Sequence, residues 1–172
     1  MDIQTFLSRA QSALAKGTKY KSPGSVPSLA AASWPISGAA TDCSGFITWC
    51  LRISRQTDHP FYVHQNGGWF DTAAIYADGE ASVGYFDKLD TPSPGSMLVY
   101  PDYVGADGKH HDGHIGIVLN ANGGKGIEAV TTIIHCSLGA SNTLGDAVQA
   151  TPPTIWINHG HSSCVWYTGL TN

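Results

Sequence analysis

Cys43 stands where a thiol could act as a nucleophile. It begins an apolar segment with helical spacing, directly after Thr41 and Asp42, and either of these residues can cap a helix. The unpaired N–H groups and the dipole at a helix start favour a thiolate, and the N–H of Ser44 could receive the oxyanion of a tetrahedral intermediate. Because free cysteines are also commonly small buried hydrophobes, position alone leaves both interpretations of Cys43 open.

His114 is the candidate base for this thiol. It begins a strongly apolar segment after a loop rich in Asp and Gly, so we expect it at the edge of a strand. From such an edge an imidazole can reach the start of a helix packed on the sheet and can act as general base and acid. His110 and His111 lie within the loop and are interpreted as ordinary polar residues.

A third polar group should orient the imidazole, and the chain offers two candidates. If the hairpin turn is centred on Gly123–Gly124, His114 pairs near Ile133, and His135 lies two residues further on, on the same face. Glu128 requires an earlier turn, which would leave several glycines inside a strand. We therefore predict His135 as the orienting residue, with Glu128 as the alternative.

The positioning elements can be outlined from periodicity and turn residues. Helices are predicted over 3–15 and 43–52 and near 69–76, and 22–40 has the composition of a loop. Strands are predicted over 97–100, 114–119, 127–136, 155–157 and 164–167. Helices first and an antiparallel sheet second indicate an α+β fold, and the length suits a single domain over 1–172.

Composition narrows the functional classes. The 172 residues are 42% apolar and 13% charged with a net charge of −4, which argues against nucleic acid as the partner. No apolar run approaches the ~20 residues that span a bilayer, so no integral membrane association is expected. The cysteines form no CxxC pair, so no structural metal and no cofactor are predicted. The first residues lack the pattern of a signal peptide, which leaves a cytoplasmic protein, a removed leader and another export route open.

Four short motifs in order resemble those of one family of hydrolases, the NlpC/P60 cysteine peptidases of the papain-like superfamily. The motifs are Asp42-Cys43-Ser44-Gly45-Phe46, Pro94-Gly95-Ser96-Met97-Leu98-Val99-Tyr100, Gly113-His114-Ile115-Gly116-Ile117-Val118 and Ile134-His135. The resemblance implies a papain-like core in which N-terminal helices pack on an antiparallel sheet. It also implies hydrolysis of peptide bonds in the stem peptides of bacterial peptidoglycan, typically between γ-D-glutamate and the diamino acid.

The resemblance further implies roles for individual residues. Cys43 would be the nucleophile, His114 the base and His135 the orienting residue of a Cys-His-His triad. Asp42 would help to hold the amino end of the substrate, and Tyr20 would be an active-site tyrosine, although a packing aromatic explains Tyr20 equally well. The partner would be a stem peptide or peptidoglycan fragment in the bacterial wall, periplasm or exterior, and the oligomeric state is left open.

Two other functions fit the same residues. The aromatic stretch 61–86 could line an acyl pocket, so a papain-like amidase, acyltransferase or deamidase acting on a lipid or a protein is the first alternative. A non-catalytic peptide-binding domain of the same fold, with an inert Cys43, is the second. The long loop 101–113 would in each case border the cleft.

Overall fold

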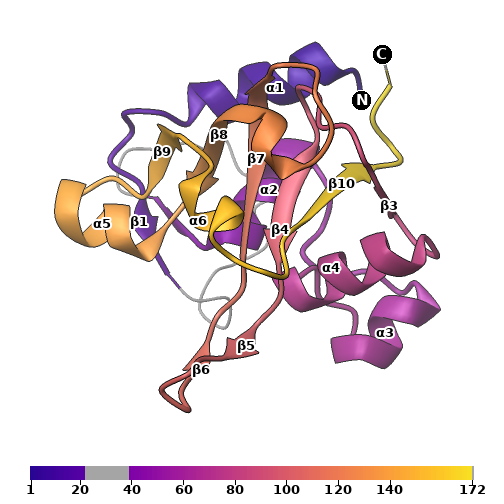
Figure 1. Ribbon diagram of the computed structural model, residues 1–172. Helices are drawn as coiled ribbons and strands as arrows, with labels where there is room; N and C mark the ends of the chain where they lie inside the picture. Colours follow the sequence, from indigo (N-terminus) through magenta and orange to yellow (C-terminus); the bar gives the residue numbers. More distant parts are fainter. Residues whose placement is uncertain (22–38, 172) are drawn as a thin grey trace.

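Six strands form one antiparallel sheet at the centre of the computed structural model, which describes residues 1–21 and 39–171 (Figure 1). The strand order is β3-β10-β4-β7-β8-β9. The bounds are β3 Phe86–Lys88, β4 Met97–Tyr100, β7 His114–Ala121, β8 Val130–Cys136, β9 Val148–Thr151 and β10 Ser163–Tyr167. Two short ribbons lie apart from it, the parallel pair β1 (Lys19–Tyr20) and β2 (Ala40–Thr41) and the antiparallel pair β5 (Tyr103–Val104) and β6 (His110–His111).

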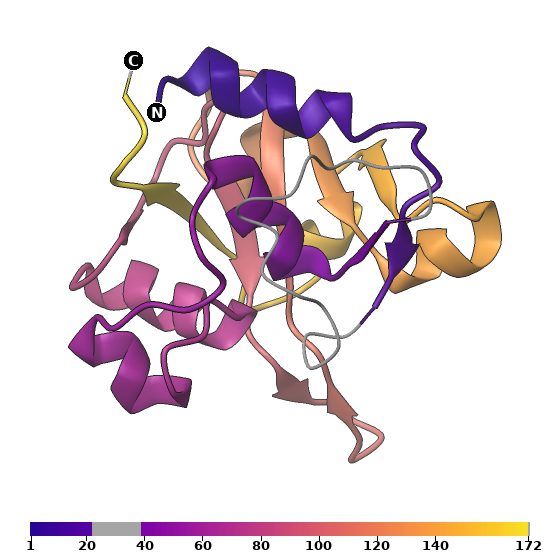
Figure 2. The same ribbon diagram turned by 180° about the vertical axis from the view of Figure 1, so that it is seen from behind.

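Helices cover both faces of the sheet. The helices of the described residues are α1 Ile3–Ser12, α2 Cys43–Leu51, α3 Pro60–Asn66, α4 Thr72–Ala81, α5 Leu138–Leu144 and α6 Thr154–Ile157. Viewed from behind, α2 lies in front of the sheet, whereas α6 lies on the side that faces the viewer in Figure 1 (Figure 2). This arrangement confirms the predicted α+β fold with N-terminal helices packed on an antiparallel sheet.

The alternation of side chains along β7 divides the core into two clusters. Ile115 and Ile117 point toward α2 and join a cluster that contains Phe46 and Ile47. Val118 belongs to the opposite cluster, with Trp156 of α6 and Leu98. All nine residues of α2 are buried, so this helix is enclosed on every side rather than amphipathic.

The predicted strand over 155–157 is wrong, because those residues form helix α6. Pro153 precedes the helix and Pro152 ends the run of strand β9, so two rigid residues turn the chain from sheet to helix. Helices α3 and α5 and strand β9 were not predicted. Apart from Ala39 and Ala40, the loop predicted over 22–40 lies outside the described residues.

The hairpin β7–β8 has a different register from the expected one. Gly116 pairs with His135 and Val118 with Ile133, because a 3-10 turn over Ile127–Ala129 and an irregularity after Val118 lengthen the connection. His135 nevertheless lies two positions from the residue opposite His114, on the same face, as the predicted turn required. Glu128 lies in the 3-10 turn, exposed and at the other end of the hairpin from His114. The alternative orienting residue is therefore wrong.

The two ends of the described chain lie side by side (Figure 1). Ile3 donates its N–H to Thr171 at 3.0 Å, and Thr171 donates its N–H to Met1 at 2.9 Å. Strand β10 inserts between β3 and β4, so the last strand of the chain is an interior strand of the sheet. Among the helices described, none has both the length and the apolar character needed to cross a bilayer.

A buried carboxylate, Asp78 of α4, ties α3 and α4 to the start of β3. It accepts hydrogen bonds from the Tyr62 hydroxyl at 2.6 Å and from the N–H groups of Gly84, Tyr85 and Phe86 at 2.7, 2.7 and 3.1 Å. Four donors that converge on one carboxylate lose a charged acceptor if the carboxylate becomes an amide.

We predict that Asp78→Asn lowers the free energy of unfolding by about 3 kcal/mol, since the amide N–H₂ would also face N–H donors. Urea unfolding followed by circular dichroism measures the change. The control is Asp87→Asn at an exposed position of β3, for which a change within about 0.5 kcal/mol is expected. Equal losses in the two variants would contradict the role of Asp78.

Candidate active site

Cys43 lies at the first turn of α2, behind the cap formed by Asp42. The residue is 5% exposed. Burial and, secondarily, the charge of Asp42 raise the pKa of the Cys43 thiol to about 12, against hydrogen bonds from the Ser44 N–H, the Tyr20 hydroxyl and the Ile115 N–H that lower it. The resting group at neutral pH is therefore a thiol, and attack requires a base that removes its proton.

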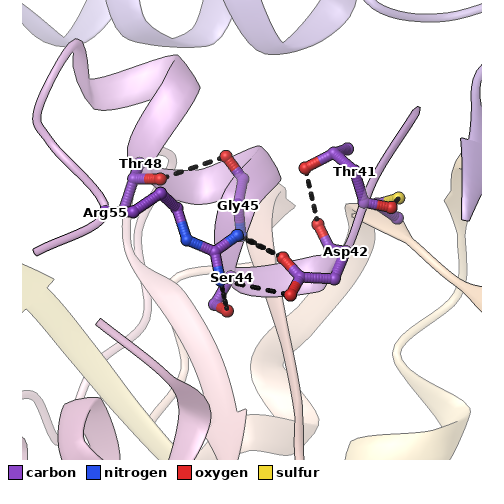
Figure 3. A network of polar contacts seen from close by, with 7 residues as sticks. Thr41, Asp42, Ser44, Gly45, Thr48 and Arg55 are labelled. Carbon is purple, nitrogen blue, oxygen red and sulfur yellow. Dashed lines mark hydrogen bonds and ion pairs between the residues drawn. The ribbon is translucent and has the colours of Figure 1, made fainter. Parts of the chain in front are cut away.

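The carboxylate of Asp42 is fully engaged within the protein (Figure 3). Oδ1 accepts from the Gly45 N–H at 2.6 Å, and Arg55 donates from Nη1 to Oδ1 and from Nη2 to Oδ2, the latter at 3.1 Å. Arg55 Nη2 also donates to Ser44 Oγ at 3.3 Å. Both charged residues are buried, so the pair fixes the start of α2 and leaves little of the Asp42 carboxylate for a substrate.

Gly45 has no side chain because the guanidinium of Arg55 occupies that space. A Cβ at this position would overlap Arg55 Nη1, Thr41 Oγ1 and Asp42 Oδ1. The absence of a side chain at Gly45 thus lets the guanidinium of Arg55 approach the backbone of α2 closely (Figure 3).

His114 and His135 are joined by a hydrogen bond between their rings. His114 Nε2 lies 2.8 Å from His135 Nδ1, and His135 Nε2 lies 3.1 Å from Thr151 Oγ1. Gly116 leaves room for this contact, because a Cβ there would lie 3.0 Å from the Cβ of His135. Because Nε2 of His114 is hydrogen-bonded to His135, Nδ1 is the ring nitrogen of His114 that remains to accept a proton.

Trp156 covers both histidines from the side of α6. Its ring stacks on His114 with centroids 5.2 Å apart and meets His135 edge-on at 5.2 Å. Burial lowers the pKa of His114 to about 3, with a second contribution from His135, and burial lowers that of His135 to about 4. Both imidazoles are therefore neutral near pH 7, the form in which a histidine accepts a proton.

The thiol and the base border adjoining clefts at the start of β7. A cleft of about 220 Å³ exposes Cys43, and a neighbouring one of about 260 Å³ exposes His114. Tyr20, Asp112 and Gly113 line both. The N–H of Ile115, next to His114, contacts the Cys43 sulfur, which places the helix start against the beginning of the strand.

The cleft at Cys43 is polar and acidic. Asp71, Asp102 and Asp112 line it, and no lysine or arginine of the described residues does so. Asp102 holds the base of the β5–β6 ribbon by accepting from the Gly113 N–H at 2.7 Å. His110 lies between Asp102 and Asp112, but all three are exposed and such surface groupings are common, so we assign no metal to them.

The structure thus gathers all six predicted site residues around one helix start and strand start. Tyr20, Asp42, Cys43 and Ser44 border the first cleft, and His114, bonded to His135, borders the second. Sequence reasoning missed Arg55, Thr151 and Trp156. Gly45 was the signal for a close neighbour, but nothing in the sequence indicated which residue that neighbour is.

Comparison with known families now gives the class of the protein. The model of the CHAP domain matches residues 34–135, a stretch that contains Cys43 and His114 and ends at His135. The chain belongs to the CHAP family, whose members are cysteine- and histidine-dependent amidohydrolase or peptidase domains of the papain-like NlpC/P60 type. The predicted relationship is confirmed at this level. A search of curated proteins finds no match to the chain.

We predict that Gly45→Ala lowers the free energy of unfolding by about 2 kcal/mol, because Arg55 must move to admit the methyl group. Thermal and urea unfolding measure the loss. The matched control is Gly139→Ala in α5, where a Cβ meets only Ser137 Oγ at 4.0 Å, and its stability should be unchanged or higher. A Gly45→Ala protein as stable as this control would contradict the tight packing.

The buried histidines also predict a pH dependence of stability. In the unfolded chain each histidine has a pKa near 6.5, whereas in the folded protein its pKa is lowered. The contribution of the neutral histidines to the free energy of unfolding is therefore intact above pH 6.5 and is lost as the pH falls toward 4. Each adds a slope of about 1.4 kcal/mol per pH unit. Urea unfolding between pH 7 and pH 4 should show a smaller slope in His114→Gln than in wild type. Identical slopes would show that His114 titrates normally.

Proposed function

We propose that this CHAP domain is a cysteine peptidase that hydrolyses peptide bonds in the stem peptides of bacterial peptidoglycan. The observation that carries the proposal is that a thiol at a capped helix start and a neutral His114, whose Nε2 is bonded to His135, border adjoining clefts. These groups adjoin a polar cleft large enough for part of a peptide. Cys43 serves as nucleophile, His114 as base and His135 as orienting residue.

In the proposed mechanism, His114 Nδ1 takes the proton of the Cys43 thiol while the sulfur attacks the carbonyl carbon of the scissile bond. The N–H of Ser44 stabilises the oxyanion. The proton then passes from Nδ1 to the leaving amine as the C–N bond breaks, which leaves a thioester on Cys43. Water, deprotonated by His114, attacks the thioester, and the acid leaves as the thiol is restored.

The lining of the cleft favours a peptide over a lipid. Carboxylates border Cys43, whereas the aromatic residues of 61–86 pack on one another: the ring of Tyr62 lies 4.7 Å from that of Phe70 and 5.7 Å from that of Tyr85. The apolar hollow beside Phe70 and Tyr85 does not include Cys43. A substrate that bears an amine suits the acidic cleft, and the diamino acid of a stem peptide bears one.

The proposed bond lies between γ-D-glutamate and the diamino acid, which is the bond the family resemblance implies. Tyr20 supports this site from β1, since its hydroxyl lowers the pKa of the Cys43 thiol and Tyr20 is part of the wall of both clefts. For Asp42 we propose a role in holding α2 through Arg55, with the substrate amine met by the exposed carboxylates of Asp102 and Asp112 instead.

The test is incubation of wild type, Cys43→Ala and the control Cys164→Ala with defined stem peptides and muropeptides, followed by mass spectrometry. Cys164 is a buried thiol of β10, away from the cleft, so its variant controls for the loss of a sulfur. We expect cleavage by wild type and Cys164→Ala and a loss of at least about a thousandfold in Cys43→Ala. Stem peptides whose diamino-acid amine is acetylated should be cut more slowly.

The products discriminate among the candidate functions. A cut between D-glutamate and the diamino acid would identify the proposed bond, and another cut lost in Cys43→Ala would retain the peptidase but change the bond. Absence of cleavage by folded wild type would overturn the proposal. Turnover of acyl or protein substrates would then favour the amidase or transferase alternative.

A further inference from the structure

Thr151, the last residue of β9, touches the histidine pair from the side opposite His114. Its Oγ1 lies 3.1 Å from His135 Nε2, and its hydroxyl donates to the carbonyl of Pro152 at 3.1 Å. Thr151 pairs with Ile133 in the sheet, so it lies diagonally across from His135 on the same face. The contact is thus set by the register of β8 and β9.

The direction of the Thr151 hydrogen bond determines which nitrogens of the two histidines carry hydrogen. A hydroxyl has one hydrogen, and when that hydrogen goes to the Pro152 carbonyl, Oγ1 accepts from His135 Nε2. A neutral His135 with hydrogen on Nε2 has a lone pair on Nδ1. That lone pair accepts from His114 Nε2, which leaves the lone pair of His114 on Nδ1.

We propose that Thr151 is a positioning residue that holds His114 in the tautomer able to accept a proton on Nδ1. The inference rests on the proposed function of His114 as base, and it extends the triad by one residue that sequence reasoning did not single out. With the opposite tautomer, His114 Nδ1 would carry hydrogen and could not take the proton of the thiol.

The surroundings of Thr151 fix the acceptor of its hydroxyl. Pro152 and Pro153 follow it, and proline restricts both its own φ and the conformation of the residue before it. The Pro152 carbonyl is therefore held on a stiff segment that leads directly into α6. The same helix places Trp156 against both rings, so one connection supplies the hydrogen-bond acceptor and the cover of the histidine pair.

The test compares Thr151→Val, which has the same shape without the hydroxyl, with Thr151→Ser, which keeps the hydroxyl. Long-range ¹H–¹⁵N NMR of the histidine rings, recorded without substrate at pH 7, should show hydrogen on Nε2 of both His114 and His135 in wild type and Thr151→Ser. In Thr151→Val the Nε2 preference of His135 should be lost. Thr131→Val, an exposed threonine of β8, is the control and should match wild type.

A kinetic readout accompanies the NMR. We expect kcat/KM on a stem peptide and the rate of Cys43 alkylation by iodoacetamide to fall about tenfold in Thr151→Val. A change of this size corresponds to the loss of one hydrogen bond that favours the reactive tautomer. Thr151→Ser should stay within about twofold of wild type. Unchanged ring tautomers in Thr151→Val, or a Thr151→Ser variant as slow as Thr151→Val, would overturn the inference.

The two proposals fail in distinguishable ways. If folded wild type cleaves no stem peptide, the substrate assignment is wrong, but the ring NMR and the alkylation rates still decide the role of Thr151. If Thr151→Val does not fold, the NMR comparison of wild type and Thr151→Ser still decides it, since hydrogen on Nδ1 of His114 in either protein would overturn the inference.

Discussion

The buried ion pair of Asp42 and Arg55 is the constraint on which the active site depends. Arg55 follows α2 and Asp42 precedes it, so their two-pronged contact closes the segment on itself and holds the helix start in one place. Two buried charges are tolerated because each has further hydrogen-bond partners, here the Gly45 N–H and the Ser44 hydroxyl. Burial first and this carboxylate second raise the pKa of Cys43, so the residue that positions the helix start also adds to the thiol's need for a base.

The sheet brings that base from its other face. Along β7, Ile115 packs under α2 while His114 faces Trp156 of α6. Thiol and imidazole therefore border adjoining clefts at the start of this strand, with Gly113 in the wall of both. Gly116 keeps this face open, which lets His135 lean toward His114 from the neighbouring strand. Burial on that face keeps both imidazoles neutral, which is the condition for one of them to accept a proton.

The sequence predicted best what local chemistry determines. The cap of α2, the strand that begins at His114 and the choice of His135 follow from helix-start residues, apolar runs and period-two alternation. The register of the β7–β8 hairpin did not follow, since a 3-10 turn over Ile127–Ala129 replaced the expected tight turn, and His135 was found on the correct face from a register that is wrong by an even number of residues. Arg55 and Thr151 act through tertiary contacts, and no local pattern marks such residues. Residues 155–157 have an apolar pattern that fits a strand as well as a short helix. The two prolines before them end strand β9 and favour the start of the helix.

The part of the chain that follows the family match completes the site rather than extending it. The match ends at His135, yet β9 supplies Thr151 and α6 supplies Trp156, both in contact with that histidine. The reacting groups and their immediate environment therefore come from different stretches of sequence. In the roles proposed above, the motifs therefore contain the nucleophile and the base, whereas Thr151, which sets the tautomer of the base, lies outside them.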